Sequence, residues 1–434
     1  MPWVLAALLV SEARASSPPG AELADLETVA PHVRLDLRYA TANNFTQERI
    51  YPVAKCYLRR EVAERLARVQ AALEAAHLGL KVFDCYRPLS VQRRLWSLVP
   101  DERYVADPAK GSRHNRAAAV DVTLVDAQGA ELEMPTAFDD FSEKAHRGYL
   151  QLPPAAIAHR ARLEEAMKAE GFVGLATEWW HFDGAGAQEY PLLDLDFDLV
   201  APLPPGTRQL VVVVAPDWSS HEATMTRFER DARGAWRPVG AALKVVTGRG
   251  MGWGLGLHPA SLAKRLGGPV KKEGDRRSPA GMFRLGELTG YAAEPPPGAT
   301  LPYRQATSRL YCVDDAAAPE YNRLALLPER GAPRWKSTEP MRRGDALYTR
   351  TVFVAHNPQA TPGAGSCIFL HVWRGEGSPT VGCTALPLDR LEELMSWLRA
   401  RDEPLLLQFP ASVWQTLAPG WGLAAGEREN LYRQ

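Results

Sequence analysis

A histidine and an aspartate stand out in GSRHNRAAAVDVTL, residues 111–124, where His114 precedes Asp121 by seven positions among small residues. Further along, EWWH sets Glu178 three positions before His181. This spacing brings a carboxylate and an imidazole near one metal ion on a helix, or on a strand with a local bulge. A zinc hydrolase needs three protein ligands, an open position for water and a nearby carboxylate that takes the water's proton. The four residues supply two imidazoles, one ligating carboxylate and one free carboxylate.

Each fragment also has a plainer structural interpretation. A histidine near an aspartate is most often a hydrogen-bonded pair, and the HExxH signature is absent, since His221-Glu222 continues as Ala-Thr-Met. Trp179 and Trp180 are predicted to pack in the wall of a core, and we assign them no chemistry. Arg87, taken alone, fits an ordinary ion pair.

Taken together, the motifs over residues 30–200 resemble the D-alanyl-D-alanine dipeptidases, the zinc peptidases that include the vancomycin-resistance dipeptidase. That family carries S-x-H-x-x-G-x-A-x-D, then E-W-W-H, with Y-R-P upstream, and all three patterns are found here at 112–121, 178–181 and 86–88. MPTAFDDF, residues 134–141, is also similar to the family's substrate-binding segment. One departure is Ala117, which stands where the family has glycine. If that glycine supplies a positive φ, the loop that holds His114 must differ slightly here.

The resemblance implies one Zn²⁺ ion held by His114, Asp121 and His181, whose charge lowers the pKa of its bound water toward ~7. Glu178 then accepts the water's proton as the water attacks the amide carbon, and passes it to the leaving amine. Arg87 is a permanent cation suited to stabilising the oxyanion of the tetrahedral intermediate.

The resemblance also implies how the substrate is held. Ser112 and Asp139 would bind the free ammonium of the dipeptide D-Ala-D-Ala. A longer, amide-capped peptide would leave the buried carboxylate unpaired, and this costs binding.

A second dense stretch is SCIFLHVWRGEGSPTVGCTALP, residues 366–387, where a histidine ends an apolar strand and a Gly/Pro-rich loop leads to Gly382-Cys383. A neighbouring imidazole lowers the pKa of a thiol, and the thiolate is the reactive nucleophile. Glycine before the cysteine lets the backbone approach a substrate and offers N–H groups to an oxyanion. A structural cysteine in a turn and a core histidine are the alternative.

Residues 207–410 resemble the catalytic domain of L,D-transpeptidases of the YkuD type, marked by a histidine followed by S/T-x-G-C. Thr380 to Cys383 fits this pattern, with His371 twelve residues upstream, a short spacing. Many members have histidine and arginine where Val381 and Ala385 stand here. GDRRSPAGMFRLG, residues 274–286, is similar to the family's substrate-cleft segment.

By this resemblance Cys383 attacks the carbonyl of the diamino acid that precedes D-Ala in a peptidoglycan stem peptide. D-Ala leaves, and the acyl group passes to an amine or to water. His356 is a second candidate imidazole, and His371 is preferred because it closes the strand that enters the motif loop.

Five cysteines occur, at 56, 85, 312, 367 and 383. An odd number leaves at least one thiol unpaired in an exported protein. If pairs form within each half of the chain, the unpaired cysteine lies in the second half. A disulfide between Cys312 and Cys367 would leave Cys383 as that thiol.

The elements that must position these residues follow from the hydrophobic pattern. Apolar side chains recur at alternating steps of four and three before Gly79, which predicts a helix with one buried stripe that ends at this glycine. LKVFDCYRP predicts a short buried strand, VDVTLV a half-buried strand, and LEEAMKAEGF a helix that ends at Gly171. The stripe consists of Val62, Leu66, Val69, Leu73 and Ala76.

This pattern predicts two domains. The first, at 22–200, is expected to be an α+β domain with helices packed on a small antiparallel sheet. APLPPG at 201–206 marks a proline-rich linker. The second domain, at 207–410, is expected to be mainly β, since runs such as QLVVVVA and PLLLQF alternate with Gly/Pro loops, with one helix at DRLEELMSWLRAR. Residues 411–434 are assigned as a C-terminal tail.

Charge and the first residues bear on partners and location. Lys plus Arg equals Asp plus Glu at 51 each, which argues against nucleic acid and anionic lipid as partners. Trp3 to Val10 is a short apolar run before Ala13-Arg14-Ala15, which has the form of a signal-peptidase site. Residues 1–15 are therefore predicted to be a signal peptide, and no later segment is long enough to span a membrane. The oligomeric state is not indicated.

The prediction is an exported protein of the periplasm or cell envelope that joins a zinc D-Ala-D-Ala dipeptidase to a cysteine L,D-transpeptidase-like domain acting on peptidoglycan stem peptides. Two alternatives stay open. The first domain could be a D,D-carboxypeptidase or another peptidoglycan peptidase, and the second a non-catalytic wall-binding module.

Overall fold

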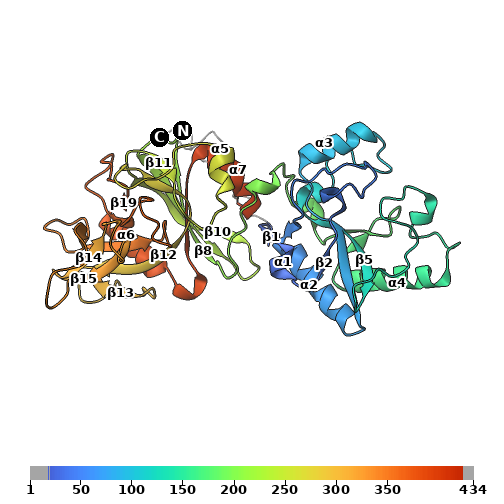
Figure 1. The fold of residues 1–434 in the computed structure, drawn as a ribbon, viewed down its shortest axis with the longest axis horizontal. Helices are drawn as coiled ribbons and strands as arrows, with labels where there is room; N and C mark the ends of the chain where they lie inside the picture. Colours follow the sequence, from blue (N-terminus) through green and yellow to red (C-terminus); the bar gives the residue numbers. More distant parts are fainter. Residues whose placement is uncertain (1–17, 19, 424–434) are drawn as a thin grey trace, which may run out of the picture.

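The protein forms two lobes that lie side by side (Figure 1). The structure, a computed structural model, describes residue 18 and residues 20–423. The predicted signal peptide, residues 1–15, and the last part of the predicted tail, residues 424–434, lie outside the described residues. Over the described part of the chain, no helix is both long enough and apolar enough to cross a membrane.

The first lobe is built on a five-stranded sheet in the order β2-β4-β5-β7-β6. The pairs β4–β5, β5–β7 and β6–β7 are antiparallel, whereas β2 runs parallel to β4, so the expectation of an antiparallel sheet is wrong at this one edge. A separate short pair, β1 with β3, lies beside it. The strands are β1 (Leu23–Asp25), β2 (Arg34–Leu35), β3 (Tyr57–Arg59), β4 (Leu78–Asp84), β5 (Ala119–Asp126), β6 (Val173–Gly174) and β7 (His181–Asp183).

Helices cover this sheet, so the α+β expectation for the first lobe is confirmed. Helix α2 carries the predicted apolar stripe, but it ends at Glu74, and Gly79 lies within β4. His77 takes the left-handed conformation after the helix, with φ of 58°. Helix α4 ends next to Gly171, whose φ of 80° matches the predicted role. The helices are α1 (Leu26–Val29), α2 (Arg60–Glu74), α3 (Leu89–Leu98) and α4 (Pro154–Ala169).

Strand β5 is buried on both faces, although alternation predicts a half-buried strand. Asp121 and Thr123 are as inaccessible as their apolar neighbours, at 3% and 0% exposure. Segment 134–141 packs on this sheet beside β5, since the ring of Phe138 lies 4.9 Å from that of Phe83 on β4 and 5.5 Å from that of Trp180, just before β7. A polar residue in such a strand must find its partner inside the protein.

The second lobe is mainly β, as predicted. Eight strands close into a barrel in the order β12-β17-β18-β19-β10-β9-β8-β20, and the antiparallel pairing of β20 with β12 completes the ring. A small sheet, β15-β14-β16, lies outside it. The barrel strands are β8 (Gln209–Ala215), β9 (Glu222–Arg230), β10 (Trp236–Val246), β12 (Ser278–Gly290), β17 (Arg350–Val354), β18 (Phe369–Val372), β19 (Thr384–Leu386) and β20 (Leu405–Pro410).

The remaining elements of the second lobe attach to this barrel. The predicted helix at DRLEELMSWLRAR is α6, which packs against β17 and β18. The shorter elements are β11 (Met251–Trp253), β13 (Tyr303–Gln305), β14 (Leu310–Val313), β15 (Arg323–Leu326), β16 (Thr338–Pro340), α5 (Ser261–Leu266), α6 (Leu388–Trp397) and α7 (Ala411–Leu417).

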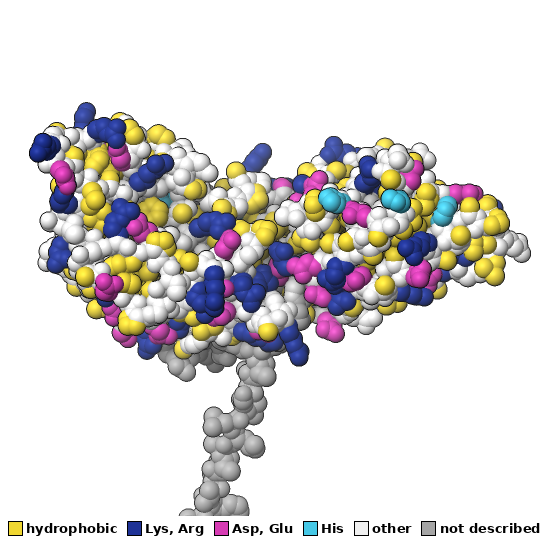
Figure 2. Space-filling model, turned by 90° about the horizontal axis from the view of Figure 1, so that it is seen from below, with side chains coloured by type: hydrophobic (Ala, Val, Ile, Leu, Met, Phe, Trp, Pro, Cys, Tyr) yellow, Lys and Arg dark blue, Asp and Glu magenta, His cyan; other side chains and the backbone are white. Residues whose placement is uncertain are grey.

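The two lobes share buried contacts. Helix α7, at the start of the segment assigned as a tail, lies between them in Figure 1, and the indole nitrogen of Trp421 donates to the carbonyl of Ala201 at 2.7 Å. Glu22, fully buried, forms ion pairs with Arg60 of the first lobe and Arg230 of β9. On the face shown in Figure 2, basic and acidic side chains are interspersed, as expected for balanced charge.

Candidate metal centre and cysteine pocket

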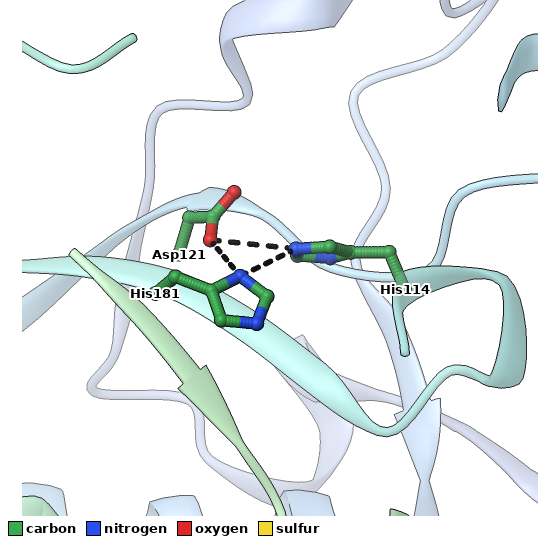
Figure 3. A group of neighbouring side chains, drawn as sticks. All are labelled: His114, Asp121 and His181. Atoms are coloured by element: carbon green, nitrogen blue, oxygen red, sulfur yellow. Dashed lines mark hydrogen bonds and ion pairs between the residues drawn. The ribbon is translucent and has the colours of Figure 1, made fainter. Parts of the chain in front are cut away.

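Three side chains from separate elements converge at one end of the first sheet. His114 opens the 3₁₀ turn η2 (His114–Arg116), Asp121 lies on β5, and His181 is the first residue of β7. Asp121 and His181 are directly opposite in the antiparallel β5–β7 pair. Asp121 Oδ1 lies 3.0 Å from His181 Nδ1 and 3.4 Å from His114 Nε2, and the two nitrogens are 3.1 Å apart (Figure 3).

These three atoms require a cation among them. His114 Nδ1 donates to the Cys85 carbonyl at 2.6 Å, so Nε2 of the neutral ring carries a lone pair. His181 Nε2 donates in the same way to Asp183 Oδ1 at 3.0 Å. Burial alone would lower the pKa of His181, but its hydrogen bonds to Asp121 and Asp183 raise that pKa to about 10, so without a metal a proton serves as the cation.

The donor set fits zinc. Two imidazoles and one carboxylate suit this ion, and ligand atoms ~2.1 Å from a tetrahedral zinc lie roughly 3.4 Å apart. The three separations of 3.0, 3.1 and 3.4 Å are close to that value. With three protein ligands a fourth position remains for water or substrate, the arrangement of a catalytic site.

Glu178 lies beside this cluster, with Oε2 4.0 Å from His181 Nδ1. It sits neither on a helix nor on a bulged strand, as its spacing suggested, but in the turn before β7, where its N–H bonds to the Leu175 carbonyl. Burial, followed by the charge of Asp121, raises the pKa of Glu178 above its usual range. A raised pKa suits a carboxylate that accepts and returns a proton near neutral pH.

Arg87 forms an ion pair, as its plainer structural interpretation predicted, and it also lines the cavity. Its guanidinium donates to Asp84 Oδ2 at 2.6 and 3.1 Å and to Gln92 at 3.0 Å. Tyr51 donates to the other oxygen of Asp84 at 2.8 Å. These contacts hold the cation in one place, and its role toward an oxyanion stays a prediction.

Ser112 and Asp139, the predicted ammonium ligands, line the same cavity. The backbone N–H of Ser112 donates to Asn115 Oδ1 at 2.7 Å, and Asp139 Oδ2 accepts from Tyr39 at 3.1 Å. Burial, followed by the charge of Asp121, raises the pKa of Asp139. A cation beside such a buried carboxyl, for example the ammonium of a substrate, stabilises its ionised form.

The cavity holds about 410 Å³. This volume suits a small ligand and is at the low end of the range for ligand sites, roughly 300–1,000 Å³. The lining of the cavity includes Tyr39, Arg87, Ser112, Arg113, His114, Asp121, Asp139, Glu178, His181 and Asp183.

Ala117 keeps the conformation that glycine adopts readily, with φ of 56° and ψ of 33°. A positive φ at this position is therefore compatible with alanine, and a difference in the loop that holds His114 stays a prediction. The N–H of Ala117 bonds to the His114 carbonyl at 3.0 Å, and its own carbonyl accepts from Arg59 at 2.8 Å. These bonds offset the roughly 1–2 kcal/mol that a left-handed residue with a side chain costs.

Asp183 is a site residue that the sequence reasoning missed. It accepts the Nε2–H of His181, and its other oxygen lies 3.5 Å from Arg113 Nε. The available signal was the alternation in HFD: two residues apart on a strand, His181 and Asp183 point to the same face.

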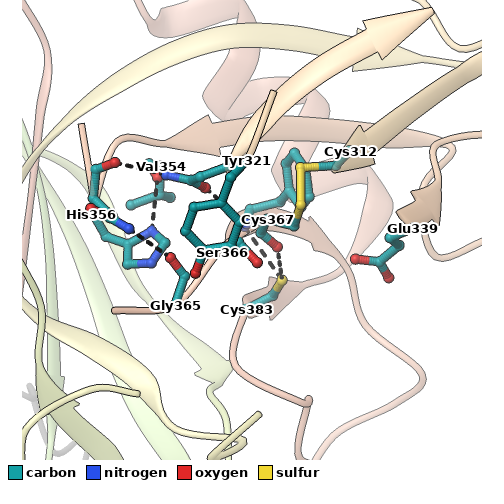
Figure 4. Close-up of a disulfide and its surroundings, with 12 residues drawn as sticks. Cys312, Tyr321, Glu339, Val354, His356, Gly365, Ser366, Cys367 and Cys383 are labelled. Atoms are coloured by element: carbon teal, nitrogen blue, oxygen red, sulfur yellow. Dashed lines mark hydrogen bonds between the residues drawn. A yellow bond between two sulfur atoms is a disulfide. The ribbon is translucent and has the colours of Figure 1, made fainter. Parts of the chain in front are cut away.

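The cysteines form one disulfide within each half of the chain. Cys312 is bonded to Cys367, Cys56 to Cys85, and Cys383 is the free thiol among the described residues. Its sulfur accepts from the Phe369 N–H at 3.4 Å and lies 3.7 Å from the Cys367 carbonyl (Figure 4).

Cys383 and His371 line one pocket of about 240 Å³, together with Tyr348 and Glu339. Cys383 directly precedes β19, which runs parallel to the strand β18 that carries His371, and the ring of Tyr348 lies 5.3 Å from that of His371. His371 Nδ1 bonds to the Val372 carbonyl at 2.8 Å.

Burial keeps both groups neutral at pH 7. It raises the pKa of the Cys383 thiol to about 12 and lowers that of His371 to about 4. The expected lowering of the thiol pKa by an imidazole is therefore not found. His356, the other candidate, is fully buried, its Nδ1 lies 3.4 Å from the Val354 carbonyl, and it is not among the lining residues of the Cys383 pocket.

Comparison with known proteins concerns the first lobe. The family model described as D-ala-D-ala dipeptidase matches residues 20–198. The D-alanyl-D-alanine dipeptidase of Escherichia coli (strain K12) is 39% identical over 189 residues, which are 97% of that protein and 44% of this chain. The dipeptidases of Streptomyces coelicolor and Enterococcus faecalis are 30% and 28% identical, over 96% and 88% of their lengths and 41% and 36% of this chain. The predicted resemblance of the first lobe is thereby confirmed, and the chain belongs to the D-alanyl-D-alanine dipeptidase family through its N-terminal domain.

Proposed function

We propose that the first lobe is a zinc-dependent dipeptidase that hydrolyses D-Ala-D-Ala. The observation that carries this proposal is the convergence of His114, Asp121 and His181 around a point that requires a cation, with Glu178 beside it. Zinc, when bound there, supplies a Lewis acid and a water of lowered pKa. The relatives that cover this lobe carry the name of the same activity.

The chain's own residues perform the remaining steps. Glu178 takes the proton of the attacking water and returns it to the amine of the leaving D-Ala. Arg87, fixed by Asp84, stabilises the negative charge on the former carbonyl oxygen. Ser112 and Asp139 bind the substrate's ammonium, and a longer, amide-capped peptide is disfavoured because it leaves the buried Asp139 carboxylate unpaired.

A matched pair of variants tests this proposal. Glu178→Gln is expected to lower kcat for D-Ala release by roughly 10²–10⁴-fold, because it cannot accept the proton, while zinc content stays at one ion per chain. Glu143→Gln, at an exposed residue of the same lobe, is the control and is expected to leave kcat unchanged. Equal activity of both variants would contradict the proposal.

The choice of substrate distinguishes the dipeptidase from the D,D-carboxypeptidase alternative. Dipeptide and a stem pentapeptide are offered in parallel to the zinc-loaded protein. The proposal requires D-Ala release from the dipeptide at a far higher kcat/KM, whereas preferential release from the pentapeptide would establish the alternative.

For the second lobe we propose a cysteine L,D-transpeptidase-like activity on peptidoglycan stem peptides. The support is a free thiol, Cys383, that lines the same pocket as His371. The thiol attacks the carbonyl before D-Ala, a thioester forms, and the amide bond breaks. D-Ala leaves with the thiol proton on its amine, and an amine or water then displaces the sulfur.

Cys383→Ala decides between this activity and a wall-binding module. Loss of D-amino-acid exchange into a tetrapeptide, with binding to isolated cell walls retained, fits the transpeptidase. If wild type and variant bind walls alike and neither exchanges D-amino acids, binding alone is the function.

We also propose export to the periplasm or cell envelope. Two disulfides in one chain support an oxidising compartment. Mass spectrometry of the protein from fractionated cells should find a mature N-terminus just after Ala15, and a cytoplasmic protein that begins at Met1 would refute export.

A further inference from the structure

A disulfide lies one hydrogen bond away from a predicted zinc ligand. Cys85 directly follows β4, and its carbonyl accepts the Nδ1–H of His114 at 2.6 Å. The sulfur of the same residue is bonded to Cys56, which directly precedes β3. Both cysteines are fully buried. The group that sets the tautomer and direction of His114 therefore belongs to a cross-linked residue.

The segment after Cys85 and the turn that carries His114 are tied together further. The N–H of Arg87 donates to the His114 carbonyl at 3.1 Å, and the Asn115 side chain donates to the Arg87 carbonyl at 2.8 Å. Three hydrogen bonds thus make residues 85–87 and 114–115 one unit. A shift of Cys85 would move His114 and the predicted oxyanion ligand Arg87 together.

Within this unit, residues 85–87 are attached to β3 by two links. One is the hydrogen bond from the Tyr86 N–H to the Tyr57 carbonyl at 3.1 Å, and the other is the Cys56–Cys85 bond. The Cys85 N–H bonds only to the side chain of its neighbour Asp84, at 2.9 Å, which does not attach it to another strand. Without the disulfide, a single hydrogen bond joins residues 85–87 to β3. The turn after His114 keeps its own contacts with β3, since the N–H and the Nε–H of Arg59 donate to the carbonyls of Ala117 and Arg116, each at 2.8 Å. The disulfide therefore fixes the Cys85 carbonyl relative to a turn that is already held.

We propose that the Cys56–Cys85 disulfide positions His114 for the metal, so that the zinc affinity of the first lobe depends on whether this disulfide is formed. Cys85 is a positioning residue, not a catalytic one. The inference rests on the proposed zinc function. Its consequence is that the chain acquires a tight metal centre only after oxidation, and the reduced chain holds zinc weakly and leaves the dipeptide uncut.

Linkage gives a test on the unaltered protein, because coupling between two equilibria is reciprocal. If the disulfide tightens zinc binding, zinc must stabilise the disulfide by the same factor. The full chain is equilibrated in mixtures of reduced and oxidised dithiothreitol, with free zinc buffered at zero or at a saturating concentration. Each protein disulfide that is reduced yields two thiols and one oxidised dithiothreitol. Alkylation and mass spectrometry then report each cysteine separately.

The Cys312–Cys367 disulfide of the second lobe is an internal control. Its cysteines are also buried, and the predicted zinc ligands lie in the other lobe. Zinc is expected to raise the ratio of reduced to oxidised dithiothreitol needed for half-reduction of Cys56–Cys85 by tenfold or more. The ratio for Cys312–Cys367 should stay unchanged. Equal shifts for both disulfides, or none for Cys56–Cys85, would overturn the inference.

Two double variants provide the converse measurement. Cys56→Ala/Cys85→Ala and Cys312→Ala/Cys367→Ala are compared in a competition of each folded protein with a chelator, after circular dichroism has established folding. The first is expected to bind zinc at least tenfold more weakly than the second, as for other disruptions of a ligand's support. Equal affinities would overturn the inference, and if the first variant does not fold, the dithiothreitol titration decides.

The inference and the proposed function fail differently. If the wild-type chain takes up no zinc, the proposed function is wrong. If it binds one zinc ion with the same affinity in both disulfide states, the function stands and only the inference fails.

Discussion

Replacing Asp183 should weaken zinc binding without touching a ligand. Its carboxylate accepts the Nε2–H of His181 at 3.0 Å and thereby leaves Nδ1 to face Asp121 and His114. In Asp183→Ala the ring loses this partner, and the tautomer with the proton on Nδ1, which cannot bind a metal, becomes accessible.

The magnitude follows from the bond that is lost. A hydrogen bond to a charged group contributes about 1.5–3 kcal/mol, and the lower part of that range applies because the Asp183 side chain is 30% exposed. A loss of about 1.5–2 kcal/mol corresponds to zinc binding roughly 10- to 30-fold weaker. Asp183→Asn keeps an acceptor but no charge, so its affinity should lie between those of the wild type and Asp183→Ala.

Competition of the apoprotein with a fluorescent chelator measures this loss directly. Asp194→Ala is the matched control, since Asp194 also pairs with an arginine, Arg93, and is 39% exposed, but does not line the cavity. A zinc affinity of Asp183→Ala within twofold of the control would refute the argument that Asp183 orients His181.

Four further outcomes are expected. Alkylation of Cys383 at pH 7 should be far slower than that of a model thiol and should rise until pH about 12, because burial raises its pKa; rapid labelling at pH 7 would contradict this burial. Glu22→Gln should lower the free energy of unfolding by roughly 3 kcal/mol in a denaturant titration, because Glu22 is fully buried and its replacement removes the charge that pairs with the partly buried Arg60 and Arg230. Burial raises the pKa of Glu22, but the charges of Arg230 and Arg60 outweigh burial and hold that pKa below 4.5. The stability that the ionised Glu22 carboxylate contributes is therefore present above pH 4.5 and is lost as the pH falls through the lowered pKa. The difference in Tm between wild type and Glu22→Gln should accordingly shrink in acid. Removal of zinc should lower Tm, since zinc at 100 times its Kd contributes about 2.7 kcal/mol, and an unchanged Tm would mean that the folded state binds no ion.

Local patterns predicted the elements better than their ends. The apolar stripe of α2 depends on side-chain periodicity alone, and all but its last member are buried as predicted. The end of that helix was misplaced because His77 adopts a left-handed conformation at which glycine was expected. The burial of β5 was underestimated because β5 is a central strand between β4 and β7, and the segments that cover this sheet, such as 134–141 with Phe138, are separate from it in sequence.

For the two sites as well, the sequence predicted the residue types better than their surroundings. The ligand types were evident in the motifs, whereas the partners that orient them were not: the Cys85 carbonyl and the Asp183 carboxylate belong to no motif used here. The neutral state of Cys383 was also unexpected, because a pKa depends on burial, which the order of residues does not reveal.

By itself, the sequence determined which side chains are available for chemistry, the periodicity of the helices and strands, and the division into an α+β half and a mainly β half. Only the tertiary structure decided that His114, Asp121 and His181 meet within hydrogen-bonding distance, that a disulfide supports one of them, and that the barrel closes through β12 and β20. The physical reason is that periodicity and residue type act over a few neighbouring positions. The distances, burial and electrostatic environment of a site arise only when segments far apart in the chain are packed together.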